Sequence, residues 1–208
     1  MKILYEDKYL AIVYKPAGVA SQPDTRGGAD MVTLLSERWQ SPAYCVHRLD
    51  TATGGVMVYA KDSRTAGKLT ASLSESSAKK EYLCVIRATG AGSGTMRDLL
   101  FHDKRKNKAY IVDRMRSGVK EALLDYETVA EKDGLSLVKV TLHTGRTHQI
   151  RVQFAGRKMP LLGDGKYGSR DNSPLALHCF HLSFIHPVTK KAMDTVFMPE
   201  SPWFTFCI

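Results

Sequence analysis

The chain has 208 residues, of which 43% are hydrophobic and 25% charged; this balance argues against disorder and fits one globular domain over residues 1–208, with room for two lobes. The formal net charge is +9, which favours an anionic partner. No apolar run approaches the length of a membrane-spanning helix, and charges interrupt the first thirty residues, which argues against membrane insertion and secretion.

The predicted elements mix strands and helices. Strands are expected at 9–14, 56–60, 80–87, 109–112, 122–129, 135–142, 175–185 and 195–198, where apolar, β-branched and aromatic residues gather between turn signals. One helix is expected after the Asp62-Ser63 pair, and a second over 149–156 with Thr147 as its cap. Glycines at 88–94 indicate a loop. The pattern predicts a single α+β domain.

Two polar motifs stand out. The first, residues 46–55, sets Asp50 beside the basic residues His47 and Arg48 and then supplies flexible glycines, so we expect an ionised and accessible carboxylate. The second, residues 144–151, contributes Arg146 and Arg151, either of which can pair with that carboxylate or with phosphate. Together they suggest a nucleophile and its clamp.

Basic residues concentrate between positions 101 and 120. Seven basic side chains there oppose two acidic ones, Asp103 and Asp113. The basic residues are Lys104, Arg105, Lys106, Lys108, Arg114, Arg116 and Lys120. Such a segment favours nucleic acid, because each neutralised phosphate releases counterions, although a solvated surface loop is the alternative.

The cysteines are widely separated and form no CxxC pair. They are Cys45, Cys84, Cys179 and Cys207. This spacing argues against a disulfide framework and a cysteine zinc site, and it favours the reducing cytoplasm. A metal site at His178 and His181 is also disfavoured, because three-residue spacing on a strand puts the two rings on opposite faces.

Six motifs, taken in order, resemble the RluA-type pseudouridine synthases. They are Tyr14-Lys15-Pro16-Ala17-Gly18, His47-Arg48-Leu49-Asp50 with Thr53-Gly54, Lys79-Lys80-Glu81-Tyr82, Gly145-Arg146-Thr147-His148-Gln149-Ile150-Arg151-Val152, Gly163-Asp164 with Tyr167-Gly168, and Leu177-His178. The resemblance implies isomerisation of uridine to pseudouridine in RNA without cofactor or metal. It also implies a mixed, largely antiparallel sheet flanked by helices and loops, with an RNA cleft across the sheet.

The resemblance also implies residue roles. Asp50 matches the catalytic aspartate, which either attacks the nucleotide covalently or removes a ribose proton. Arg151 matches its charge partner, and Tyr82 matches the tyrosine that meets the base. Arg48 matches the arginine that fills the gap left by the flipped nucleotide, and Leu177 the floor of the uracil pocket.

RNA contacts complete the expected site. The residues expected to hold the RNA backbone are Arg105, Lys106, Lys108 and Arg146, with His148 facing the same cleft. The expected partner is ribosomal or transfer RNA, with no DNA or membrane, and a monomer is the default. The S4 RNA-binding module that precedes the catalytic pattern in many relatives is not expected, since that pattern starts within the first ten residues.

The chain departs from the family at two places. Thr53-Gly54-Gly55 stands where the family usually has Thr-Ser-Gly, and Gln153 stands where a histidine commonly follows Arg-Val. Two other functions compete with this interpretation of the motifs. A protein-kinase catalytic loop is excluded, because this chain has a leucine between the arginine and the aspartate and Gly55 where the kinase asparagine would stand. A non-catalytic RNA-binding protein or RNA chaperone with the same fold remains the alternative.

Overall fold

The computed structural model describes residues 1–25, 27–75, 77–199 and 204, so Cys207 lies outside the described residues. The chain forms two compact units. Unit 1 combines Met1–Lys80 with His178–Pro199, and unit 2 is built from Glu81–Leu177.

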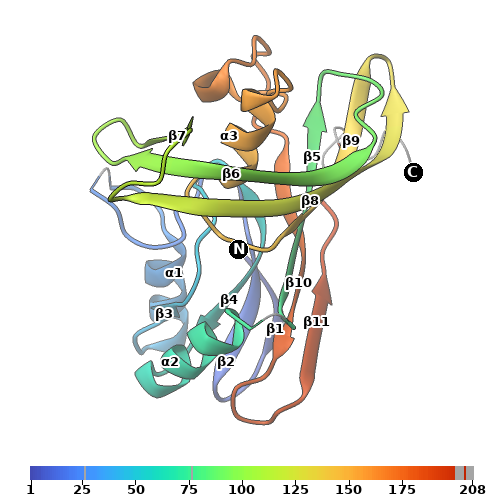
Figure 1. Ribbon diagram of the computed structural model, residues 1–208. Helices are drawn as coiled ribbons and strands as arrows, with labels where there is room; N and C mark the ends of the chain where they lie inside the picture. The colour runs from blue at the N-terminus through green and yellow to red at the C-terminus, as the bar shows by residue number, and fades with distance from the viewer. Residues whose placement is uncertain (26, 76, 200–203, 205–208) are drawn as a thin grey trace. The chain divides into compact units, whose positions relative to one another are not determined.

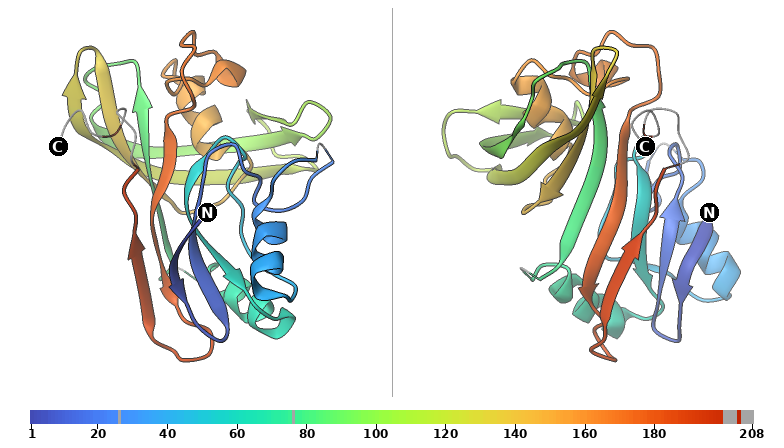
Figure 2. Two further views of the ribbon diagram at one scale, coloured as in Figure 1. Left: turned by 180° about the vertical axis from the view of Figure 1, so that it is seen from behind. Right: turned by 90° about the vertical axis from the view of Figure 1, so that its right-hand side faces the viewer.

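Unit 1 holds a mixed sheet with two helices. Its elements are β1 (Lys2–Glu6), β2 (Leu10–Lys15), α1 (Met31–Trp39), β3 (Tyr44–Cys45), β4 (Gly54–Ala60), α2 (Ser63–Ser72), β10 (Leu177–Ile185) and β11 (Ala192–Val196). The strand order is β1-β2-β4-β10, with β3 beside β4 and β11 beside β10. Strands β4 and β10 are parallel, whereas β2 runs antiparallel to both β1 and β4 (Figure 2).

The core of unit 1 explains why its strands are so apolar. Every residue of β4 is buried, and Leu69 and Leu73, placed four residues apart around the end of α2, pack against β2 and β4 residues such as Ile12 and Val58. Asp62 begins α2 by accepting a hydrogen bond from the Thr65 amide at 2.8 Å, as the Asp62-Ser63 pair predicts.

Unit 2 is an antiparallel sheet with one α-helix. Its elements are β5 (Lys79–Ile86), β6 (Ser93–Asp103), β7 (Lys108–Val112), β8 (Val119–Lys132), β9 (Leu135–Leu142), α3 (Gln149–Gly156) and the short 3-10 turn η1 (Gly165–Tyr167). The strand order is β5-β9-β8-β6-β7, and α3 packs against β6 and β7 (Figure 1). The mixed, largely antiparallel α+β fold is therefore confirmed.

Some elements of the fold were not predicted from the sequence, and one predicted helix cap is wrong. The unpredicted elements are β1, β3, β6 and α1, although Asp30 caps α1 in the same way that Asp62 caps α2. Thr147 does not cap α3; the residue before the helix is His148, in the left-handed conformation with φ of 54°. Instead, the Gln149 side chain accepts from the Arg146 amide at 3.0 Å.

Candidate active site

The loop that carries Asp50 is anchored on its N-terminal side. Leu49 is buried, its amide donates to the Ser21 hydroxyl oxygen at 3.0 Å, and that hydroxyl donates back to the Leu49 carbonyl at 2.8 Å. The Tyr59 hydroxyl in turn donates to the Ser21 carbonyl. Because β4 is buried along its whole length, these contacts fix the residue before Asp50 to the core of unit 1.

A buried lysine anchors the other side of the same loop. Lys15 Nζ donates to the carbonyls of Val19 at 2.7 Å, Pro16 at 3.0 Å and Thr51 at 3.3 Å, and the Gly18 amide also donates to Thr51. Burial lowers the pKa of Lys15 to about 8, while the charge of Asp50 opposes this change. Lys15 was named in the sequence only as part of the first family motif, and this anchoring role was not predicted.

The glycines after Asp50 have different requirements. Gly55 has φ of +142°, and a Cβ there would lie 2.4 Å from the Cys179 carbonyl oxygen of β10, so this position requires glycine. At Gly54 a Cβ would meet its nearest atom, His178 Nδ1, at 3.4 Å, which is an ordinary contact. Position 54 can therefore hold either glycine or the serine of the family pattern, whereas position 55 requires glycine.

His47 is a structural residue rather than a cation beside Asp50. Its Nε2 accepts a hydrogen bond from the Val58 amide at 3.1 Å, and burial lowers the pKa of His47 to about 3. The expectation of two basic neighbours is therefore corrected to one, Arg48, which is exposed. That exposure is compatible with the predicted contact of Arg48 with RNA.

In unit 2, Arg151 is held by a carboxylate that the sequence analysis did not single out. Its Nε and Nη2 each lie 2.8 Å from one carboxylate oxygen of Asp164. Both side chains are buried, with 9% and 1% exposure. A side-on pair of this kind fixes which edge of the guanidinium faces Asp164 and leaves Nη1 on the opposite edge. The Gly163-Asp164 motif was the signal, and Arg151 lies in its expected helix, α3.

Tyr167 covers one face of the same guanidinium. The Arg151 Cζ lies 5.1 Å from the centre of the Tyr167 ring. The Tyr167 hydroxyl lies 2.9 Å from His148 Nδ1 and accepts from the Ala109 amide at 2.8 Å. His148 is therefore buried against Tyr167, so its predicted RNA contact stands beside a clear structural role.

The other expected site residues of unit 2 are distributed over its strands and loops. Tyr82 lies in β5 opposite Val140 and is 7% exposed, and Leu177 begins β10 and is also buried. Arg146 is half-buried, and its Nε donates to the Glu121 carbonyl at 2.8 Å, which holds the loop before α3 to β8. Asp50 and Arg151 belong to different units, and their pairing stays a prediction.

Several of the basic residues expected to hold RNA lie in or beside one turn. Arg105 and Lys106 are exposed between β6 and β7, where the Asp103 carboxylate accepts from both of their amides. Lys108 begins β7, and its Nζ lies 5.1 Å from the Tyr167 ring centre. We call residues 104–108 the basic hairpin. The Asp103 side chain thus caps the turn, and the Arg105 and Lys106 side chains are exposed on it.

Gln153, the second departure from the family pattern, joins α3 to β6. It is fully buried, and its Nε2 donates to the Asp98 carboxylate at 2.7 Å and to the Met96 carbonyl at 3.2 Å. Asp98 also binds Arg157 at the end of α3. The residue that differs from the family pattern therefore helps to hold α3, the helix that carries Arg151, against β6.

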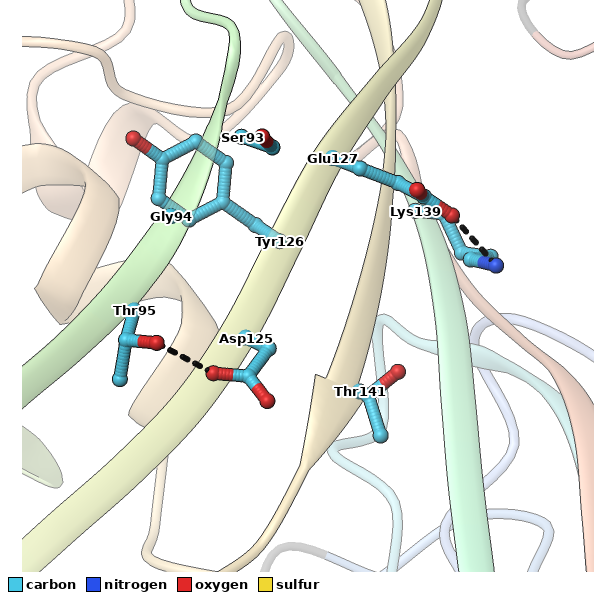
Figure 3. A pocket seen from close by; sticks show the side chains of 8 residues that line it. All are labelled: Ser93, Gly94, Thr95, Asp125, Tyr126, Glu127, Lys139 and Thr141. Carbon is cyan, nitrogen blue, oxygen red and sulfur yellow. Dashed lines mark hydrogen bonds and ion pairs between the residues drawn. The ribbon is translucent and has the colours of Figure 1, made fainter.

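A shallow depression on the sheet of unit 2 is separate from these residues. Its walls come from β6, β8 and β9, and Figure 3 shows that hydrogen bonds or ion pairs join Thr95 to Asp125 and Lys139 to Glu127. None of the predicted catalytic residues lines it. Among the residues that the structure describes, no group of three or more acidic, histidine or cysteine side chains is placed to hold a metal ion, and no helix is long and apolar enough to cross a membrane.

Comparison with known proteins confirms the resemblance. The family model described as RNA pseudouridylate synthase matches residues 9–156. The chain is 32% identical to the uncharacterized RNA pseudouridine synthase YhcT of Bacillus subtilis, over 98% of this chain and 68% of that protein. It is 29% identical to tRNA pseudouridine synthase C of Pasteurella multocida, over 98% of this chain and 93% of that protein.

The fold also matches a solved structure. Human RNA pseudouridylate synthase domain containing 4 superimposes with a TM-score of 0.76 at 23% identity, covering 96% of this chain and 89% of that one. At this identity the likeness concerns the fold.

Proposed function

Because this chain belongs to the RNA pseudouridylate synthase family, we propose that it isomerises specific uridines in ribosomal or transfer RNA, with Asp50 as the catalytic carboxylate. The observation that carries this proposal is the anchoring of the Asp50 loop. Ser21 holds Leu49 and Lys15 holds Thr51, so both neighbours of Asp50 are fixed to the buried core of unit 1. Such preorganisation is what a nucleophile or general base needs.

The reaction breaks the bond between ribose C1′ and uracil N1, turns the base, and joins C1′ to uracil C5. Asp50, ionised, either bonds to the nucleotide or removes a ribose proton; in both routes the proton on C5 is finally released to a base or to water. Arg151 is the proposed charge partner that keeps Asp50 ionised, and Asp164 orients its guanidinium. Tyr82 stacks on the uracil, above a pocket floored by Leu177.

RNA binding in this proposal uses the catalytic chain itself. Flipping a uridine out of a folded RNA costs a few kcal/mol, which contacts between phosphates and the basic hairpin offset. Arg146 and His148 add to this surface, and Arg48 fills the gap in the stack. The protein acts as a cytoplasmic monomer on RNA, without DNA, membrane, metal or cofactor.

The test is release of tritium from RNA labelled at uridine C5, because forming the new bond at C5 frees that label. Ribosomal and transfer RNA from a strain lacking the gene are incubated separately with the wild type and with Asp50→Asn. We expect release from one pool, by the wild type alone. Tight binding to RNA without release from either pool would instead support the RNA chaperone.

A further inference from the structure

The turn that carries Asp164 also carries an aromatic ring placed against the same arginine. The Asp164 carbonyl accepts from the Tyr167 amide at 3.0 Å, so both residues belong to one tight turn. Gly163 and Gly168, with φ of +75° and +96°, flank it, and a Cβ at Gly163 would lie 2.2 Å from the Pro174 carbonyl oxygen. The turn can take this shape only with glycine at Gly163.

This turn controls two directions of the Arg151 guanidinium. Asp164 binds its edge through two hydrogen bonds of 2.8 Å, and Tyr167 covers its face at 5.1 Å from the ring centre. The two hydrogen bonds to Asp164 alone leave the plane of the guanidinium able to tilt about its bonded edge. A ring against its face removes that freedom, and cation–π attraction adds to the contact.

Tyr167 is at the same time tied to the basic hairpin. Its hydroxyl accepts from the Ala109 amide at 2.8 Å, and Lys108 Nζ lies 5.1 Å from its ring. Lys166, its neighbour, donates to the Asn107 carbonyl at 2.9 Å. The ring also packs against the buried cluster around Ala109 and Val152. One side chain therefore touches the hairpin expected to hold RNA and the arginine expected to serve catalysis.

We propose that Tyr167 is a positioning residue that sets the plane of Arg151 and couples it to the basic hairpin. The Ala109 amide holds the Tyr167 ring, and the ring holds the guanidinium, so a phosphate that binds Lys108 and steadies the hairpin also restrains Arg151. Binding of RNA then improves the alignment of the catalytic arginine. This inference rests on the proposed function, because it assumes that Arg151 serves the isomerisation.

The first arm of the test separates positioning from simple packing. Tyr167→Leu removes the ring, and we expect kcat for tritium release to fall about 10- to 100-fold, with the KM for RNA changed far less. Tyr167→Phe keeps the ring against Arg151 and should restore kcat to within about fivefold of the wild type. It also tests the proposal if Tyr167→Leu does not fold.

A matched control is a second aromatic ring that packs against the same helix. Tyr126 is half-buried and packs edge-on against Phe154 of α3, with ring centres 5.6 Å apart. Tyr126→Leu removes a comparable ring that packs against α3 and leaves the contacts of Arg151 in place. We expect it to lower the Tm and leave kcat within about twofold below that temperature.

The second arm tests coupling by a double-mutant cycle. In the wild-type background we expect Lys108→Ala to raise KM and lower kcat. In the Tyr167→Leu background we expect it to raise KM only, since the link to Arg151 is already lost. Equal kcat effects of Lys108→Ala in both backgrounds, or an unchanged kcat in Tyr167→Leu, would overturn the inference.

The two levels of proposal fail in different ways. If Asp50→Asn is inactive and Tyr167→Leu is as fast as the wild type, only the role of Tyr167 is lost. If the wild type turns over no RNA, or Asp50→Asn is as active as the wild type, the proposed function fails and this inference with it.

Discussion

At the scale of single residues, the structure explains how charges are kept where solvent is scarce. Arg151 and Asp164 are both buried and neutralise each other, whereas Lys15 is surrounded by carbonyl oxygens and has a lowered pKa of about 8. Burying these charges costs desolvation energy, so such arrangements are expected only where the position of the charged group matters. Each one fixes a group that the proposed reaction needs.

Removing Arg151 should therefore affect stability as well as turnover. Arg151→Ala leaves Asp164 buried without this partner, and we expect a loss of about 3–5 kcal/mol in the free energy of unfolding together with near-complete loss of tritium release. The control is Arg157→Ala at the end of α3, whose pair with Asp98 is partly exposed; it should cost about 1 kcal/mol or less. Urea unfolding measures both, and an active Arg151→Ala would refute the proposed clamp.

Lys15 predicts a pH dependence of stability. The folded protein releases this proton near pH 8, but the unfolded chain keeps it up to about 10.5, so between these values the unfolded state binds more protons and stability rises with pH. The gain across that window is on the order of 3 kcal/mol. Lys15→Met removes the titrating group and with it this gain in stability.

The measurement is the unfolding free energy of wild type minus that of Lys15→Met, taken at about pH 7 and about pH 10. The difference should become more favourable to the wild type at the higher pH. A difference that stays constant would mean that Lys15 titrates alike in both states.

At the scale of elements, the close approach of β4 and β10 sets the position of the Asp50 loop. The strands are parallel there, with Gly55 facing Cys179 and Gly54 facing His178 in register. No side chain fits between Gly55 and β10, because a Cβ would contact the Cys179 backbone. The family glycine that the packing requires, Gly55, is thus retained, and the position that differs from the family, Gly54, is the one that tolerates a side chain.

Substitution of these two glycines gives a matched pair. Gly55→Ala should destabilise the protein by about 2 kcal/mol or more, since the strands must separate and the backbone conformation is strained. Gly54→Ala, with contacts no closer than 3.4 Å, should cost about 1 kcal/mol or less. Thermal unfolding compares them, and equal losses would contradict the packing argument.

The basic hairpin predicts a salt effect. Lys106→Ala should weaken RNA binding and reduce the slope of log K against log salt by about 1, because one phosphate contact is lost. Lys132, at the end of β8, supplies a surface control of equal charge change. Filter binding at several salt concentrations measures both. Equal slopes for Lys106→Ala and the wild type would exclude a phosphate contact by Lys106.

At the scale of the whole molecule, local patterns predicted most strands but fewer of their supports. Helix α3 and strand β9 begin and end where the sequence pattern places them, because apolar periodicity and turn residues define both. Strand β6 was missed because its polar and charged residues resemble a surface loop until β8 pairs with it. Ser21 was missed because its partner Leu49 lies 28 residues away in sequence. The contacts of Asp164 with Arg151 and of Lys15 with three carbonyls were missed because they depend on how the loops fold, which no local pattern encodes.

Independence from metal is a further prediction for this protein. The family resemblance implies aspartate chemistry without a cofactor, so turnover on a short RNA hairpin should persist in excess EDTA. The hairpin is chosen because larger RNAs need cations for their own folding. Loss of turnover that added zinc or manganese restores would contradict this prediction.

The most direct test of the central claim uses the cell's own RNA. Ribosomal and transfer RNA from a strain lacking the gene are mapped for pseudouridine, before and after complementation with the wild type or with Asp50→Asn. The proposal predicts that particular uridines stay unmodified in the deletion strain and become pseudouridine with the wild type only. An unchanged map in the deletion strain, or full modification with Asp50→Asn, would contradict an aspartate-dependent synthase.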